Sequence, residues 1–280
     1  MKTFEKIIEN KKNVLLVFDH GLGDMVLFLP VFHELKKQMG KRIDLASPIR
    51  RQFHLIDPCI IPIQENDTFL REKYDYIYRV RYPDSKNSLI PTEYNDDPPK
   101  PYLCALYEFG MKPFIWRAIR KENPLYNKDS KRVGFHFFGH TSFETKFCPK
   151  DVAETMWEET IKAGYEPFEI HMRPQYFISM LPNQFEVDSF KYAIKENSLR
   201  FEDPDLSLMI QEICKCRFFF GVDSGPLYLS SMFLGLENIV GLQSMKYISH
   251  FLPTPIQNVS VRQFDKDRFL RILERLEEQY

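Results

Sequence analysis

The sequence of 280 residues has no excess of one charge, because 38 basic residues are balanced by 39 acidic residues. The net charge of −1 argues against a protein that holds nucleic acid through bulk positive charge, although it leaves a local basic groove open. No apolar run approaches the roughly 20 residues that a membrane helix requires. The first residues lack the apolar stretch of a signal peptide, so we expect a cytoplasmic protein without a transmembrane segment.

Cysteine is also scarce, and it does not occur in paired motifs. The five cysteines include no C-x-x-C pair, and their number is odd. A disulfide framework is therefore not expected, and free buried thiols are the better interpretation. Cys214 and Cys216 form a C-x-C pair, but no histidine or further cysteine lies close in sequence, so core packing is favoured over metal binding.

What the sequence does contain is an alternation of buried-strand and helical patterns. The first strand is predicted at residues 14–18, and the helical pattern after it ends at Gly40 and contains Pro30, which should kink or divide the helix. Further predicted strands are 43–46, 59–63, 76–80, 133–138, 166–170, 217–222 and 239–242. Predicted helices in the second half are 151–163, 206–214, 227–234 and 264–280. We interpret the proline-rich residues 82–102 as a long surface loop.

These patterns form two α/β halves, and the break between them lies near residues 123–130. We therefore predict an N-terminal domain at residues 1–127 and a C-terminal domain at residues 128–280. The final helix is assigned to the second domain, with packing against the first domain as the alternative.

Each half has a turn carrying glycine and aspartate after an apolar strand. In the second half, Asp223-Ser224-Gly225-Pro226 precedes a helix whose N-terminus suits a phosphate group. The alternative is an ordinary helix cap formed by Asp or Ser. In the first half, Gly23-Asp24 opens a helix without the G-x-G-x-x-G pattern, so a nucleotide site there is only weakly supported. Asp24 is interpreted either as a helix cap or as a general base.

Three segments together resemble glycosyltransferase family 9, the ADP-heptose:lipopolysaccharide heptosyltransferase-like group. The first is Gly21-Leu22-Gly23-Asp24 with Pro30, which resembles the family's GxGD…P opening. The second runs from Val133-Gly134-Phe135-His136 to Lys146-Phe147-Cys148-Pro149 and is similar to the family's lysine motif, with Cys148 in place of a tryptophan. The third, Asp223-Ser224-Gly225-Pro226-Leu227-Tyr228-Leu229, resembles its D-[ST]-G-P-x-H-L signature, with Tyr228 in place of the histidine.

The resemblance implies a GT-B fold, in which two Rossmann-like parallel-sheet domains face a central cleft. It further implies an inverting, metal-independent transfer of a sugar from a nucleoside diphosphate-sugar donor to an acceptor hydroxyl, with no cofactor. Asp24 would be the catalytic base, and Gly23, Arg50 and Arg51 would lie on the acceptor side. The residues implied to bind the donor are Thr141, Ser142, Lys146, Asp223, Ser224, Gly225 and Tyr228.

The acceptor is the open part of this interpretation. A saccharide is the family's usual acceptor, while a modified nucleic-acid base or a protein is the alternative, and nucleic acid enters only as an acceptor. A non-catalytic nucleotide-binding relative is a second class of hypothesis, disfavoured because a pure binder has no need for Asp24. A sugar-nucleotide epimerase or dehydrogenase is a third, disfavoured because the sequence has no G-x-G-x-x-G pattern.

Overall fold

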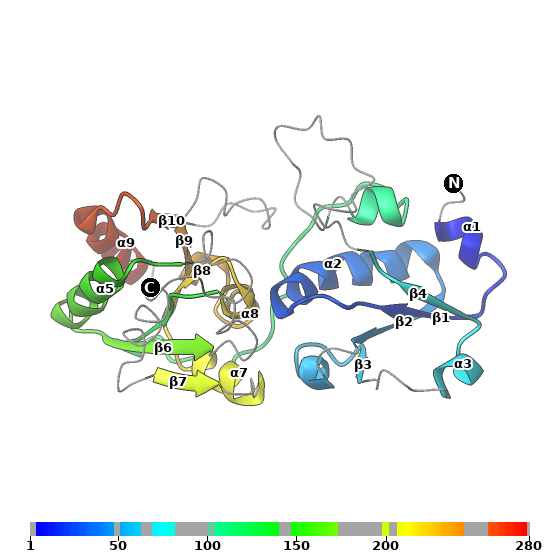
Figure 1. The fold of residues 1–280 in the computed structure, drawn as a ribbon, viewed down its shortest axis with the longest axis horizontal. Helices are drawn as coiled ribbons and strands as arrows, with labels where there is room; N and C mark the ends of the chain where they lie inside the picture. The colour runs from blue at the N-terminus through cyan, green and yellow to red at the C-terminus, as the bar shows by residue number, and fades with distance from the viewer. Residues whose placement is uncertain are drawn as a thin grey trace, which may run out of the picture. The chain divides into compact units, whose positions relative to one another are not determined.

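A computed structural model of the chain describes residues 4–47, 51–62, 69–81, 101, 104–139, 147–172, 198–201, 206–243 and 257–278. The described residues form two compact units, one reaching to Ile119 and the other beginning at Arg120 (Figure 1). Each unit is built on its own parallel sheet. No helix in this described part of the chain combines the length and the apolar character that a membrane span requires.

The first unit is a four-stranded parallel sheet with the strand order β3-β2-β1-β4. Its strands are β1 (Asn13–Val17), β2 (Arg42–Ser47), β3 (Ile60–Pro62) and β4 (Tyr76–Arg79). Its helices are α1 (Phe4–Ile8), α2 (Leu22–Met39), α3 (Phe69–Lys73), the 3-10 helix η1 (Arg51–Leu55) and the π-helical turn η2 (Cys104–Glu108).

Strand β1 is the centre of this unit because apolar side chains cover both of its faces. Leu15 and Val17 pack with Ala46 and Tyr74 in one cluster. Directly after the strand, the Phe18 ring stacks on Phe28 of α2 with the ring centroids 4.6 Å apart. A continuous apolar run is what a strand buried on both faces requires, which is why the sequence pattern located β1.

Helix α2 runs undivided for 18 residues with Pro30 inside it, so of the two predicted effects of this proline, a kink or a division, the division does not occur. A proline within a helix removes one backbone hydrogen bond, which costs about 3 kcal/mol. Its neighbours Leu29 and Val31 are completely buried, and burial of such side chains stabilises by a comparable amount. The predicted stop at Gly40 is confirmed, because this residue has a φ of 60° and its N–H donates to the Lys36 carbonyl at 3.1 Å.

The second unit is a six-stranded parallel sheet with the order β10-β9-β8-β5-β6-β7. Its strands are β5 (Arg132–His136), β6 (Glu166–Met172), β7 (Ser198–Phe201), β8 (Phe218–Val222), β9 (Ile239–Gln243) and β10 (Gln257–Ser260). Its helices are α5 (Lys150–Lys162), α7 (Leu206–Cys214), α8 (Gly225–Phe233), α9 (Lys266–Glu278) and the 3-10 helix η4 (Leu236–Asn238). The edge strands β7 and β10 were not predicted from the sequence.

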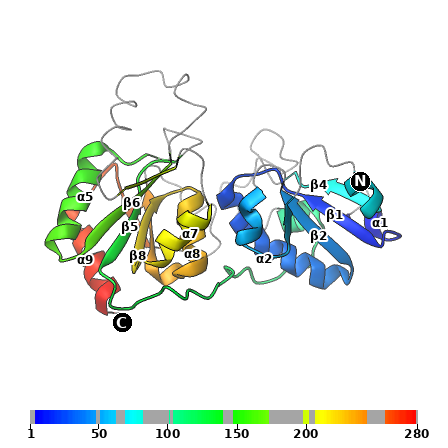
Figure 2. The same ribbon diagram turned by 90° about the horizontal axis from the view of Figure 1, so that it is seen from below.

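Helices cover both faces of this sheet, with α5 and α9 on one side and α7 and α8 on the other (Figure 2). The aromatic run of β8 serves both faces, since Phe218 and Phe220 belong to the cluster that contains side chains of α5 and α9. Phe219 points the other way and covers Gly134 of β5, where an added Cβ would lie only 2.4 Å from the ring. The predicted role of these phenylalanines as core residues is confirmed, because all three are fully buried.

Candidate functional site

Both sheets have a switch point, where the chain reverses the direction in which it adds strands. In the first unit β2 and β3 lie on one side of β1 and β4 on the other, and in the second unit β6 and β7 lie on one side of β5 and β8 on the other. Ligands of open parallel sheets bind outside the carboxyl ends of the strands at such points. Asp24 lies in the first turn of helix α2, which follows β1, and the turn after β8 carries Asp223 and Ser224. The two predicted motifs therefore lie at the switch points of their own sheets.

The turn after β8 brings strand and helix very close together. An added Cβ on Gly221 would lie 3.2 Å from the Cβ of Leu227, so a larger residue at this strand position would push helix α8 away. Ser224 is the N-cap residue of α8, in an extended conformation with φ −160° and ψ 170°. Pro226 is buried in the first turn of the helix, a position where its missing N–H has no cost. This geometry points the helix N-terminus to the carboxyl edge of the sheet.

Asp223 is a positioned carboxylate, not an exposed one. Its side chain is 7% exposed, and its Oδ1 accepts a short hydrogen bond from the hydroxyl of Tyr228, which is 3% exposed. The tyrosine lies five positions later, on α8, so this bond ties the turn to the helix that follows it. Tyr228 stands where the family signature has histidine, and here its hydroxyl is the donor to Asp223.

Ser224 presents the opposite situation. Its hydroxyl makes no capping bond to α8, and within the described residues its buried Oγ has no hydrogen-bond partner. The helix start also leaves the N–H groups of Gly225 and Leu227 without an intrahelical acceptor. A hydroxyl and two N–H groups at the positive end of a helix are donors suited to a phosphate group. The alternative interpretation of Ser224 as an ordinary cap does not match this geometry.

The three other residues expected at the donor site, Thr141, Ser142 and Lys146, lie outside the described residues. The chain on either side of that segment is described, since Phe138 and Phe147 form an antiparallel bridge. Their rings meet edge to face with centroids 5.9 Å apart. Next along the chain, the N–H of Cys148 donates to the Phe137 carbonyl at 2.9 Å. Phe138 and Phe147 therefore both lie at the carboxyl end of β5.

Asp24 lies at the third position of α2, and the N-cap position is occupied by Gly21 instead. Its side chain is half-buried, and within the described part of the chain its carboxylate makes no hydrogen bond or ion pair. An added Cβ on Gly21 would lie 3.8 Å from Asp24 Oδ2, so the carboxylate lies over the helix start. In the structure Asp24 therefore does not cap α2, and its carboxylate oxygen atoms are available to another group. Gly23, next to it, is buried.

Sequence reasoning missed an ion pair at the same edge of the first sheet. Asp19 follows β1, Arg79 ends β4, and the carboxylate lies 2.7 Å from the guanidinium. The arginine side chain is 72% exposed and that of the aspartate 21%. Their positions in the sequence could have indicated this pair. Asp19 follows β1 and Arg79 ends β4, and these two parallel strands are neighbours in the sheet. The expected acceptor-side residue Arg50 lies outside the described residues, as does the side chain of Arg51.

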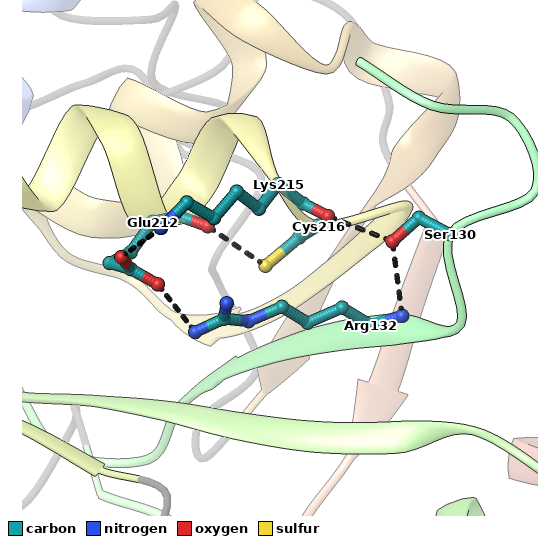
Figure 3. A network of polar contacts seen from close by, with 5 residues as sticks. All are labelled: Ser130, Arg132, Glu212, Lys215 and Cys216. Atoms are coloured by element: carbon teal, nitrogen blue, oxygen red, sulfur yellow. Dashed lines mark hydrogen bonds and ion pairs between the residues drawn. The ribbon is translucent and has the colours of Figure 1, made fainter. Parts of the chain in front are cut away.

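The C-x-C pair is confirmed as a structural feature of the second unit. Burial raises the pKa of Cys214 to about 11 and that of Cys216 to about 12, so both are thiols at neutral pH. Cys216 belongs to a polar network at the amino end of β5 and β8, where Glu212 of α7 lies between two cations (Figure 3). The contacts are Arg132–Glu212 at 2.5 Å, Lys215–Glu212 at 2.6 Å, Ser130 to the Lys215 carbonyl at 2.9 Å and Cys216 to the Glu212 carbonyl at 3.3 Å.

His136, which lies inside strand β5, is a buried and hydrogen-bonded histidine, as predicted. His136 is 1% exposed, and its Nδ1 donates to the Ile170 carbonyl of the neighbouring strand at 2.6 Å. Cys148, which stands where the family has tryptophan, is fully buried, and burial raises the pKa of its thiol.

Comparison with solved structures identifies the fold. The chain superposes over its full length on a glycosyltransferase family 9 protein from Veillonella parvula DSM 2008, covering 99% of that chain with a TM-score of 0.66 and 13% identity. It also matches ADP-heptose lipopolysaccharide heptosyltransferase II of E. coli, with a TM-score of 0.65, 15% identity and coverage of 95% of this chain and 99% of that one. For E. coli heptosyltransferase WaaC with ADP the TM-score is 0.60 at 10% identity, with 94% and 99% covered.

No family model and no curated protein matches the sequence. The structural matches nevertheless confirm the expected GT-B fold with its two parallel-sheet units and C-terminal helix, and they confirm the resemblance to family 9 heptosyltransferases at the level of the fold.

Proposed function

We propose that this protein is an inverting glycosyltransferase that moves a sugar from a nucleoside diphosphate donor to an acceptor hydroxyl without a metal ion. The observation that carries the proposal is the turn after β8, where Ser224 Oγ is buried without a bonding partner among the described residues, beside the N-terminus of α8. Because the fold is that of heptosyltransferases, a heptose-like sugar is the first donor to test.

The second unit is proposed to hold the donor. Ser224 Oγ and the N–H groups of Gly225 and Leu227 would donate to the diphosphate, and the positive end of α8 would offset its charge. Lys146, with Thr141 and Ser142, would complete the contacts to the diphosphate. The bond from Tyr228 makes Asp223 a positioning residue for this turn. That WaaC was solved with ADP supports a nucleoside diphosphate as the ligand.

The first unit is proposed to activate the acceptor. The acceptor oxygen attacks the anomeric carbon, the bond from that carbon to the diphosphate breaks, and the electron pair leaves with the diphosphate. The hydroxyl proton passes to Asp24. Within the described residues the Asp24 carboxylate makes no hydrogen bond, so none has to be broken before it accepts the proton. One in-line attack inverts the anomeric centre, so one base and one stabilised leaving group suffice. We propose a saccharide acceptor contacted by Gly23, Arg50 and Arg51, and cytoplasmic residence.

Binding of the donor is tested by thermal shift with a panel of nucleoside diphosphates and nucleotide-sugars, because a ligand of the folded state raises the melting temperature. We expect Lys146→Ala to weaken binding of the diphosphate by about 1–3 kcal/mol, the range for a charge-assisted contact. Lys128→Ala is the matched control, since Lys128 is exposed elsewhere on the same unit.

Two results would contradict the proposal in different ways. If no nucleotide raises the melting temperature of the parent, the donor assignment fails as a whole. If nucleotides stabilise the parent and Lys146→Ala equally, a donor is bound but the diphosphate contacts are wrong.

A further inference from the structure

Three side chains that can bind a metal ion meet in the first unit, away from the turn that follows β1. His33 lies on α2, and Asp57 and Cys59 lie in the segment between η1 and β3. One ligand atom of each side chain lies within 4.8 Å of the others. This combination is imidazole, carboxylate and thiol, and it comes from two parts of the chain that are 24 residues apart.

The carboxylate of this cluster is already oriented. Asp57 is 5% exposed, and its Oδ1 accepts the backbone N–H of Cys59 at 3.0 Å. That bond leaves Oδ2 directed to His33 Nε2, at 3.2 Å. Pro58 between the two ligands restricts the turn further. Hydrogen bonds that orient a ligating carboxylate are typical of metal sites, because they fix the ligand before the ion arrives.

The distances fit a tetrahedral ion with little movement. Ligand atoms about 2.0–2.1 Å from Zn²⁺ at tetrahedral angles are about 3.3 Å apart, close to the 3.2 Å between His33 Nε2 and Asp57 Oδ2. The sulfur of Cys59 lies within 4.8 Å of the other two ligand atoms, so it needs to move by about 1 Å at most, which a side-chain rotation provides. The His33 side chain is 45% exposed, so the cluster is open to solvent and water can be the fourth ligand.

We propose that His33, Asp57 and Cys59 form a zinc-binding site. Zn²⁺ is the ion that thiolate, imidazole and carboxylate ligands jointly favour in tetrahedral geometry. The bound ion would link α2 to the turn that leads into β3 and so stabilise the first unit. His33 lies nine positions after Asp24 on the same helix, about 13.5 Å along its axis at 1.5 Å per residue, so the zinc is separate from the proposed transfer reaction.

The alternative is an ion pair between His33 and Asp57 in which Cys59 takes no part. An ion pair needs no thiol, so the cysteine distinguishes the two interpretations. Cys59 is also experimentally accessible, because it is the one cysteine of the five that is not buried.

Titration of the full-length protein with Co²⁺, in a reductant that does not bind metal, tests the site directly. We expect one Co²⁺ per chain with a thiolate-to-cobalt absorption band, displaced by Zn²⁺. Cys59→Ser should abolish that band, and His33→Ala should weaken binding at least about 100-fold, beyond the effect of losing an outer contact. His54→Ala is the matched control, since His54 is an exposed histidine of η1 outside the cluster, and it should bind like the parent.

Alkylation of the unmodified protein gives a readout that needs no variant. Cys59 should be the first thiol labelled, and stoichiometric Zn²⁺ should slow its labelling at least tenfold. The proposal is overturned if no thiolate-to-cobalt band appears, if Cys59→Ser retains it, or if Zn²⁺ leaves the labelling rate of Cys59 unchanged.

Discussion

The two switch-point turns use the same residue type in opposite ways. After β1, Asp24 is half-buried with no hydrogen bond among the described residues. After β8, Asp223 is buried and bonded by Tyr228, while the neighbouring Ser224 hydroxyl has no partner in the described part of the chain. The first turn thus leaves a negative group available, and the second leaves hydrogen-bond donors available. The arrangement after β1 suits removal of a proton, and the arrangement after β8 suits binding of an anion. The position at a switch point therefore indicates where a site lies, and the local contacts decide which chemistry the site supports.

The comparison is tested most strongly by Asp24→Asn. A general base contributes about 10²–10⁴-fold, so we expect turnover to fall at least roughly 100-fold while donor binding is unchanged. The melting temperature should change by only a few degrees, because a charge in the first turn of a helix contributes about 0.3–1 kcal/mol. Transfer rates and thermal unfolding measure the two effects.

Asp151→Asn is the control for Asp24→Asn, since Asp151 lies exposed in the first turn of α5 and carries the same kind of helix-start charge. It should lose the same small amount of stability and no activity. An Asp24→Asn protein that folds and transfers sugar at nearly the parent rate would remove Asp24 from the mechanism, and one that unfolds would assign it a structural role.

Tyr228→Phe tests whether the Asp223 carboxylate is a positioning group. Removing the hydroxyl leaves a buried carboxylate with one donor fewer, which should lower the free energy of unfolding by about 1–3 kcal/mol. Nucleotide binding should weaken as well, because the turn that carries Ser224 is no longer tied to α8. Chemical denaturation and nucleotide titration measure the two effects.

Tyr74→Phe is the control, since Tyr74 donates to Asp44 at 2.8 Å in the first unit. It should cost stability and leave nucleotide binding unchanged. If both variants weaken nucleotide binding equally, the effect is general destabilisation and Asp223 is not a positioning residue of the donor site.

Ser224→Ala should have a smaller effect. The hydroxyl makes no capping bond, so its removal should leave the melting temperature of the free protein unchanged. One hydrogen bond to a charged phosphate contributes about 1.5–3 kcal/mol, so nucleotide affinity should fall by roughly 10-fold or more. A variant that loses stability but keeps its affinity would show that the hydroxyl acts as a cap after all.

The smallest expected effect is that of chelation on transfer. The Asp-x-Asp pattern nearest in sequence to the donor turn, Asp203-Pro204-Asp205, ends 18 residues before Asp223. The donor turn itself carries no such motif, so turnover should persist in EDTA. The Cys59→Ser variant, which lacks one ligand of the proposed zinc site, should also keep its turnover in EDTA. Because this variant has no structural zinc to lose, any loss of its activity in EDTA would come from removal of a catalytic ion. Activity that disappears in EDTA and returns with Mn²⁺ in this variant would refute metal-independent transfer.

The sequence located most of the fold because its central strands are continuous apolar runs. The runs at β1, β5 and β8 are buried on both faces, and such a pattern has few alternatives. The strands β7 and β10 escaped prediction because each has only four residues, Ser-Leu-Arg-Phe and Gln-Asn-Val-Ser, with no continuous apolar run. For Pro30 the sequence left a kink and a division of α2 both open, because local rules for proline do not include the burial of its neighbours.

By itself the sequence determined the two α/β halves, the glycine stop at Gly40 and the presence of Asp24 and Asp223 after apolar strands, because these depend on neighbours along the chain. Only the tertiary structure decided what those aspartates contact, since Tyr228 reaches Asp223 through the first turn of α8 and no group among the described residues reaches Asp24. It also decided the Asp19–Arg79 pair and the meeting of His33 with Asp57 and Cys59. Residues distant in sequence come together only when the order and register of the strands are set, and that order is a property of the packed sheet.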